Sequence, residues 1–439
     1  RFLVECGVKS VFLAPGNANV HLLDSIGRCE KLSFFCPEGE NSASMATEAY
    51  SKISDNLGVL VLSSGSSGTN AISGIARAWV DSTPILVISG QDRIEFEDES
   101  KVRQLGTKSL NIVDIVKPIT KYAVRVTDTK TIHYHLEKAV SLAKTGRPGP
   151  VWIDVPLDIQ GTSCNFSELK KYKINKPKKD KLNLTLLKRI EKLIKKSKRP
   201  VFWFGNGIKL SQAEFLMPKL LKKIPIPFFL SWSAVDLLPS SHKLNFGRPG
   251  VYGNRASNLI LQSSDLIISI GARLSIPMIG YVHDEFARDA KIIYVDIDKK
   301  EIKKLSKKIN IKVNLDAKIF IEDLVKKTSI KSSFIKSISK WKLYCNRTLD
   351  KYPHLEKTTH SDKKGFINSY NFLEKFSSEL RKTDCVVTDM GTALLSGHQI
   401  MKFNGKQKMI TSQGLGEMGF GLPGAIGASF ASNKSDVIC

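Results

Sequence analysis

The chain has 439 residues, a formal net charge of +25 at pH 7, and hydrophobic and charged fractions of 42% and 25%. This length accommodates about two or three domains with their own cores, and the composition is typical of a soluble globular protein. No run of about 18 or more apolar residues occurs, so we expect no membrane-spanning helix.

The excess of basic residues has two interpretations. A nucleic-acid-binding surface would gather Lys and Arg with aromatic residues on one face. Here the lysines concentrate in Lys170–Lys198 and Lys299–Lys312, which read as a linker and helix exteriors. We therefore favour a solvated basic surface with some preference for anionic ligands, and we expect no nucleic-acid partner.

Seven cysteines are scattered along the chain, without a C-x-x-C pair or a histidine at metal-ligand spacing. This pattern supports neither a disulfide framework nor a zinc site, and a reducing cytoplasm is the default compartment. The chain begins with Arg1 in a segment that reads as the end of a helix, so we expect a clipped start rather than a signal peptide.

Residues 8–160 alternate strand and helix patterns. Apolar runs predict strands at Val8–Ala14, Leu32–Phe35, Gly58–Leu62, Ile85–Ser89 and Val151–Val155. Helices are expected at His21–Gly27, at Asn41–Ser54, and from the GSSGTN turn to Asp81. Buried apolar strands separated by helices predict a parallel, doubly wound sheet. Ligands of such sheets bind at the carboxyl ends of the strands, where Gly16, Gly65 and Gln91 fall.

A linker over Gly161–Leu182 precedes a second α/β unit. Its predicted strands are Val201–Phe204, Ile224–Leu230, Leu266–Ile270 and Ile292–Asp296, with a Lys-rich helix after the last. Gly205-Asn206-Gly207 is a weak dinucleotide signal because the third glycine of the fingerprint is missing, and a tight turn is at least as plausible a reading.

Lys326–Lys364 reads as a polar connection to a third unit. This unit is predicted to contain a helix at Ser369–Leu380, a strand at Cys385–Thr388, the segment Lys408–Thr411, and a strand starting at Asp436.

The stretch Ser412–Ser429 is the most distinctive part of the sequence. Six glycines fall within fourteen residues, and such a backbone can adopt positive φ and approach a flat ligand closely. Pro423 suits the first turn of a helix, and the Gly-Ala-Ile-Gly-Ala run after it predicts a thin helix for close packing. Met418 stands among the glycines as a single large side chain.

Taken together, these segments resemble the thiamine-diphosphate enzymes of the acetolactate synthase type, in particular acetolactate-synthase-like proteins associated with surface-polysaccharide synthesis. The resemblance rests on Glu40, GSSGTN, Gly90-Gln91, GRPGPVWIDVP, DMGT and GLGEMGFGLP, in the family's order. It implies an α/β fold of three doubly wound parallel-sheet domains. These are a pyrimidine-binding domain over 1–160, a central domain over 183–328, and an incomplete diphosphate-binding domain over 366–439.

The resemblance also implies roles for individual residues. Glu40 matches the family's activating carboxylate, which hydrogen-bonds the aminopyrimidine ring and needs an apolar setting. Its alternative role is a helix N-terminal acid, favoured by the helix dipole. Met418 matches the residue that props the cofactor into its bent shape, and the carbonyl of Gly416 matches the acceptor for the pyrimidine amino group.

Further positions are carried over with less similarity. Gly391 and Thr392 sit where the family contacts the diphosphate, although its members usually have Gln-His after that glycine. Gly16 and Asn70, as cofactor-binding residues, and Gln91, as a catalytic residue, match positions on the substrate side. Gln91 is expected to contact a substrate carbonyl, with a strand-end cap as its alternative role.

Several features depart from the family pattern. The metal motif Gly-Asp-Gly followed by Asn is absent, so we expect the Mg²⁺ ligands beyond Cys439, no metal ligand within the chain, and an inactive fragment as it stands. The family's His before the activating Glu is Gly39 here. Thr107-Lys108-Ser109 replaces a Phe-Gln-Glu segment, and the charged loop Asp92–Gly106 is long, which makes a larger or anionic acceptor plausible.

The resemblance implies a cytoplasmic enzyme that depends on thiamine diphosphate and Mg²⁺. We expect a lyase or transferase that decarboxylates a 2-oxo acid such as pyruvate and joins the remainder to an acceptor, working as a homodimer or homotetramer. Two-carbon transfer to an activated sugar and a non-catalytic assembly subunit are the alternatives. FAD binding rests only on Gly205-Asn206-Gly207 and Gly271-Ala272-Arg273.

Overall fold

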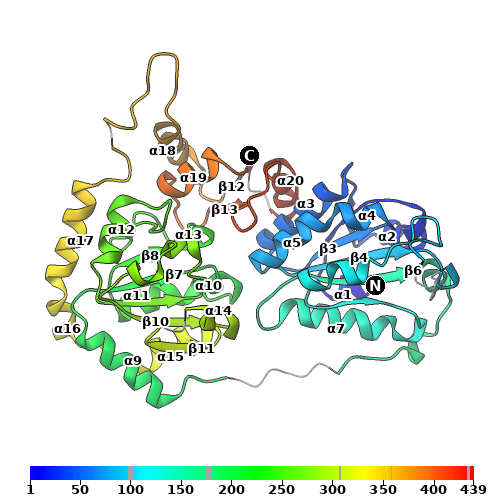
Figure 1. The fold of residues 1–439 in the computed structure, drawn as a ribbon, viewed down its shortest axis with the longest axis horizontal. Helices are drawn as coiled ribbons and strands as arrows, with labels where there is room; N and C mark the ends of the chain where they lie inside the picture. Colours follow the sequence, from blue (N-terminus) through cyan, green and yellow to red (C-terminus); the bar gives the residue numbers. More distant parts are fainter. Residues whose placement is uncertain (97–101, 174–179, 306–307, 357, 433–435) are drawn as a thin grey trace. The chain divides into compact units, whose positions relative to one another are not determined.

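The computed structural model describes residues 1–96, 102–173, 180–305, 308–356, 358–432 and 436–439 (Figure 1). These residues form two compact units. The first contains 1–177, 385–390 and 410–439, and the second contains 178–384 and 391–409. The predicted boundaries of the three domains stay predictions, because the compact units group the chain differently.

The first unit is built on a six-stranded sheet in the order β2-β1-β3-β4-β6-β5. Each neighbouring pair in it is parallel, as the apolar strand patterns predicted. In that order the strands are Ser33–Phe35, Ser10–Leu13, Gly58–Leu62, Ile85–Gln91, Val151–Pro156 and Ala123–Arg125.

Helices cover both faces of this sheet. They are α1 (Phe2–Glu5), α2 (Val20–Gly27), α3 (Glu40–Ser54), α4 (Ser66–Asn70), α5 (Ile72–Asp81), α6 (Ile112–Val116), α7 (Ile132–Lys144) and α8 (Leu157–Gly161). Helices α7 and α3 lie on opposite sides of this sheet (Figure 1). Val59 and Val61 of β3 share a buried cluster with residues of α7, whereas Leu60 and Leu62 share one with residues of α3. The period of two along a strand thus divides the core into two layers.

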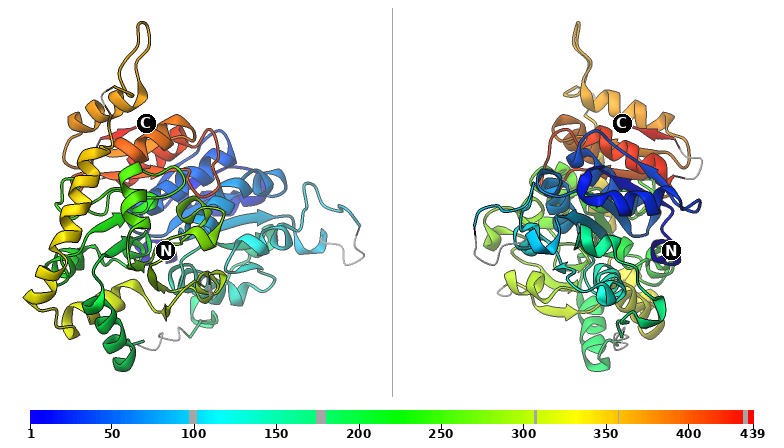
Figure 2. Two further views of the ribbon diagram at one scale, coloured as in Figure 1. Left: turned by 60° about the vertical axis from the view of Figure 1, so that its left-hand side comes forward. Right: turned by 90° about the vertical axis from the view of Figure 1, so that its right-hand side faces the viewer.

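A three-stranded sheet contains β13 (Lys408–Thr411), β12 (Cys385–Thr388) and β14 (Val437–Ile438), in that order. The helix between β13 and β14, α20 (Gly421–Ala431), packs on α3, and Figure 2 shows this red helix beside the blue N-terminal segments. A Cβ placed on Gly427 would lie 2.0 Å from the carbonyl oxygen of Ala46. The thin helix predicted after Pro423 therefore packs as closely as its composition indicated.

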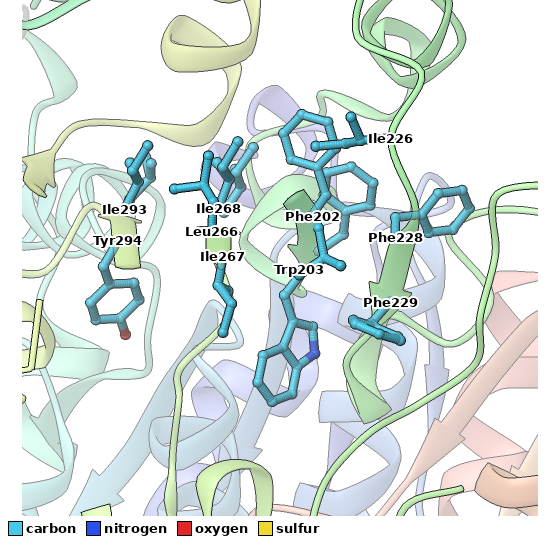
Figure 3. Packing of buried hydrophobic residues seen from close by; sticks show 14 of the residues in the cluster. Phe202, Trp203, Ile226, Phe228, Phe229, Leu266, Ile267, Ile268, Ile293 and Tyr294 are labelled. Carbon is cyan, nitrogen blue, oxygen red and sulfur yellow. The ribbon is translucent and has the colours of Figure 1, made fainter. Parts of the chain in front are cut away.

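The second unit contains a five-stranded parallel sheet in the order β11-β10-β9-β7-β8. In that order the strands are Ile311–Asn314, Lys291–Asp296, Leu266–Ile270, Pro200–Phe204 and Phe228–Leu230. Side chains alternate between the faces: Phe202 and Phe228 lie on one side, and Trp203 and Phe229 on the other (Figure 3). With sheets of six, five and three strands, the predicted α/β fold of three parallel-sheet domains is confirmed.

The helices of the second unit surround its sheet and continue beyond it. They are α9 (Leu184–Lys196), α10 (Gly207–Leu210), α11 (Met217–Lys223), α12 (Arg255–Gln262), α13 (Ile276–Ile279), α14 (Lys299–Lys304), α15 (Ala317–Lys327), α16 (Ser332–Ser337), α17 (Ser339–Lys351), α18 (Ser369–Glu379) and α19 (Thr392–Ile400). Within the described ranges, no helix is both long and apolar enough to span a bilayer.

The prediction of a polar connection over Lys326–Lys364 was wrong. This region contains α16 and α17, and the apolar residues Phe334 of α16, Ile338 between the helices, and Trp341 and Cys345 of α17 are buried. These residues recur at the helical spacing of three and four, which would place them on one face of a helix. The Lys and Ser residues between them make this apolar pattern hard to recognise in the sequence.

The predicted strand Ile224–Leu230 is shorter than expected and begins only at Phe228. Pro225 and Pro227 lack the N–H groups that a sheet ladder needs. Parts of four predicted segments fall at 97–101, 174–179, 306–307 and 357, outside the described residues.

Candidate functional site

Glu40 and Asn70 come together at the carboxyl edge of the six-stranded sheet. Glu40 is the first residue of α3 and Asn70 the last of α4. The Asn70 side-chain amide donates a hydrogen bond to Glu40 Oε2 at 3.2 Å. Glu40 is only partly buried in the single chain, so its carboxylate is oriented by Asn70 and remains accessible. The apolar setting expected for Glu40 stays a prediction.

Glycines allow the turns at this edge to lie against one another. A Cβ on Gly16 would lie 2.3 Å from Ser63 Oγ, and one on Gly90 would lie 1.9 Å from the Ala18 carbonyl oxygen. Gly65 has a φ of +62° and lies against the backbone of Lys108. The turns that follow these strands therefore lie together at the carboxyl edge of the sheet, as predicted. Glycine is required where one turn closely approaches another.

Gln91 is buried rather than open to a ligand, with 1% of its surface exposed. Its Nε2 donates to the carbonyl of Leu110 at 2.9 Å and lies 3.4 Å from Asp154 Oδ2. Burial raises the pKa of Asp154, with hydrogen bonds from Ser89 and Arg125 acting in the opposite direction. These contacts are what a strand-end cap requires, and contact between Gln91 and a substrate stays a prediction.

The glycine-rich stretch forms a loop between β13 and α20. Gly416 and Gly419 have φ of +78° and +87°, which favour glycine. Asp389 holds the end of the loop, because its carboxylate accepts the N–H of Gly419 at 2.8 Å and that of Phe420 at 3.2 Å. Met418 is 86% exposed. The expectation that this stretch can adopt positive φ is confirmed at these two of its six glycines.

A buried charge cluster that the sequence interpretation missed anchors this loop. Arg77 has no exposed side-chain surface and lies 2.5 Å from Glu48, which is also buried. Arg77 also donates to the carbonyl of Thr411 at 2.8 Å and lies 3.3 Å from the centre of the Phe420 ring. The available signal was an arginine within an apolar helix, which places a cation on a face that must be buried.

Gly391 and Thr392 lie in the second unit. Gly391 has a φ of +98° and precedes α19, of which Thr392 is the first residue. Thr392 is exposed at this helix N-terminus, where the dipole favours an anion. The contact of Gly391 and Thr392 with a diphosphate stays a prediction.

Two other expectations concern a flavin and a metal. A Cβ on Gly205 would lie 2.1 Å from the Gly271 carbonyl oxygen, and Gly207 donates its N–H to that same oxygen at 3.0 Å. Contact between two turns therefore explains these glycines without a nucleotide. In the part of the chain that the structure describes, no group of three or more His, Cys, Asp or Glu residues could hold a metal ion.

Three family models match consecutive parts of the chain. The N-terminal TPP binding domain of thiamine pyrophosphate enzymes matches residues 1–115, the central domain matches 187–324, and the C-terminal TPP binding domain matches 389–439. The site residues of the first unit come from the first and the last of these regions.

Curated relatives are similar over nearly the whole chain. The acetolactate synthase large subunit of Lactococcus lactis subsp. lactis (strain IL1403) is 30% identical over 99% of this chain and 73% of its own length. That of Corynebacterium glutamicum is 30% identical over 100% of this chain and 68% of its own length. The isozyme 1 large subunit of Escherichia coli (strain K12) is 28% identical, with 100% and 75% covered.

Proposed function

Because the chain belongs to the thiamine-pyrophosphate-dependent enzymes of the acetolactate synthase type, we propose that it decarboxylates a 2-oxo acid and transfers the remaining unit to an acceptor carbonyl. Pyruvate is the proposed donor, since the relatives are named acetolactate synthases. The observation that carries the proposal is the accessible Glu40 carboxylate, oriented by Asn70.

The groups around the glycine-rich loop fit thiamine diphosphate. Within the described residues, the carbonyl of Gly416 accepts no hydrogen bond, so it is free to accept one from an aminopyrimidine. Met418 is exposed and able to support a bent ligand. The cofactor, when bound, supplies the carbanion chemistry that side chains cannot provide.

The protein's own part is to move and hold one proton and to exclude water. Glu40 is proposed to hold the proton at Oε1 or Oε2, with the Asn70 amide fixing the carboxylate plane. Gly391 and Thr392 are proposed to contact the diphosphate, and Mg²⁺ is proposed as the second cofactor. Burying the reacting groups would strengthen the interactions of Glu40, because the local dielectric constant falls.

Exposed apolar side chains support the proposed homodimer or homotetramer. Met418 is 86% exposed and Leu422, one residue into α20, is 67% exposed. Contiguous patches of exposed apolar side chains mark contact surfaces, and Met418 and Leu422 are four residues apart in the sequence. We propose that a second copy of the chain covers this surface and thereby excludes water from the site.

The proposal is tested with the complete protein, thiamine diphosphate, Mg²⁺ and pyruvate. We expect release of CO₂, and we expect Glu40→Gln to lower its rate by about 10²–10⁴-fold, as for loss of a group that transfers a proton. Glu38→Gln replaces an exposed carboxyl two residues earlier and should retain the rate. No release from any of a panel of 2-oxo acids, with calorimetry showing bound cofactor, would contradict catalysis and favour a non-catalytic assembly subunit.

A second candidate acceptor is an activated sugar. The observation favouring it is that the backbone and Cβ of Lys108 lie against Gly65 at the carboxyl edge of the sheet, while the Lys108 side chain is exposed and its charge is available to attract an anionic acceptor. Mass spectrometry of the products distinguishes the two: acetolactate indicates a second pyruvate as acceptor, and a sugar extended by two carbons indicates the alternative.

A further inference from the structure

Among the described residues, five charged side chains form a cluster where α3 and α5 contact the glycine-rich loop. Glu48 and Lys52 come from α3, Arg77 and Asp81 from α5, and Glu417 from the loop itself. Lys52 lies 2.7 Å from Glu48 and 2.6 Å from Asp81, and Arg77 lies 2.5 Å from Glu48. Glu48 and Asp81 already balance the two cations, so an ionised Glu417 adds a surplus negative charge.

Glu417 has only distant partners for its carboxyl group. Its Oε2 lies 3.5 Å from Arg77 Nε and 3.5 Å from Ser412 Oγ. Its Oε1 is buried and has no hydrogen-bond partner within the described part of the chain. Burying an unpaired carboxylate costs far more free energy than burying the neutral acid. This geometry suits a protonated carboxyl group.

We infer that Glu417 is a positioning residue of the glycine-rich loop, which it holds as a neutral acid and loosens when it ionises. The inference rests on the proposed function, because Glu417 lies between Gly416 and Met418, the residues proposed to contact the cofactor. The Glu417 N–H donates to Ser412 Oγ at 2.8 Å, so the loop backbone is fixed at the same residue. An ionised Glu417 would compete with Glu48 for Arg77. The resulting shift of its side chain would strain the hydrogen bond from the Glu417 N–H to Ser412 Oγ.

Glu417 stays mostly protonated up to about pH 7. Burial raises the pKa of Glu417 from 4.5 to about 7, Arg77 acts in the opposite direction, and Glu48 and Asp81 add to the rise. The folded chain therefore holds an extra proton between pH 4.5 and about 7. The stability that this proton contributes is fully present below pH 4.5 and is lost as the pH rises through about 7.

The first test needs no cofactor. Glu417→Gln keeps the shape of the neutral acid and cannot ionise. Between about pH 5 and 7, we expect the unfolding equilibrium constant of the unmodified chain, from urea denaturation, to rise more steeply with pH than that of the variant, by up to about tenfold per pH unit. Glu5→Gln replaces an exposed carboxyl of the same unit and should keep the steeper slope. Parallel slopes for Glu417→Gln and the unmodified chain overturn the inference.

The second test measures thiamine diphosphate binding to the complete protein with Mg²⁺, by calorimetry from about pH 6 to 8.5. We expect the Kd of the unmodified protein to rise above pH 7, and that of Glu417→Gln to change with pH by less than about twofold. The same pH dependence in both proteins overturns the positioning role. Failure of both proteins to bind at any pH overturns the proposed function instead, while the denaturation slopes still report whether Glu417 ionises in this window.

Discussion

Arg77 connects three segments of the first unit although it has no exposed side-chain surface. It contacts Glu48 on α3, the Thr411 carbonyl at the end of β13, and the Phe420 ring at the start of α20. The contact with Glu48 is a close approach of opposite charges rather than an aligned hydrogen bond. The Arg77 side chain thus connects both ends of the glycine-rich loop to helices α3 and α5.

Replacing Arg77 with Met should leave the buried Glu48 charge with Lys52 as its remaining cation. We expect a loss of about 3–5 kcal/mol in the free energy of unfolding at pH 7, measured in urea, because the buried Glu48 charge loses the closer and fully buried of its two cationic partners. Arg28→Met breaks an exposed ion pair with Asp24 and should cost less than about 1 kcal/mol. Equal costs for the two variants would show that the buried pair contributes no more than a surface pair.

At the scale of elements, the contact between α3 and α20 depends on small residues. Gly427 approaches the backbone of Ala46, and Ala49 and Ala428 belong to the same buried cluster. Two helices can approach this closely only where side chains are absent or small, because larger ones would hold the backbones apart. Helix α3, which begins with Glu40, is thereby fixed against α20, which follows the glycine-rich loop.

Gly427→Ala should force these two helices apart, since the added Cβ would lie 2.0 Å from the Ala46 carbonyl oxygen. Overpacking of this kind costs about 1–3 kcal/mol, and the melting temperature should fall accordingly. Gly27→Ala is the matched control: it lies at the end of α2 with nothing within 4 Å of the new Cβ. Its helix propensity should keep or slightly raise the melting temperature. A smaller loss at Gly427 than at Gly27 would refute the packing argument.

At the scale of the whole molecule, exposed apolar groups bear on assembly. Leu422→Asp places a charge on the surface proposed to meet a second copy, and we expect the complete protein to shift toward monomers in sedimentation velocity. Leu184→Asp, at an exposed position of α9, should leave the distribution unchanged. An unmodified protein that is monomeric at all concentrations would contradict the proposed dimer.

The sequence by itself determined the three-part α/β architecture, most strand positions, and the positive φ of the glycine-rich loop. These features follow from local patterns, because alternation, apolar runs and glycine spacing are properties of neighbouring residues. It failed at α16 and α17, where lysines masked a buried stripe, and at β8, where prolines shorten the strand.

Only the tertiary structure brought Glu48, Arg77 and Glu417 together, from positions up to 369 residues apart in the sequence. It also showed Gln91 to be enclosed by internal hydrogen bonds. Burial and charge balance depend on which segments meet, and no pattern of neighbouring residues records that. The backbone conformation of the loop could be predicted from its glycines. The protonation of Glu417, the acid that holds the loop, depends instead on how α3, α5 and the loop pack together.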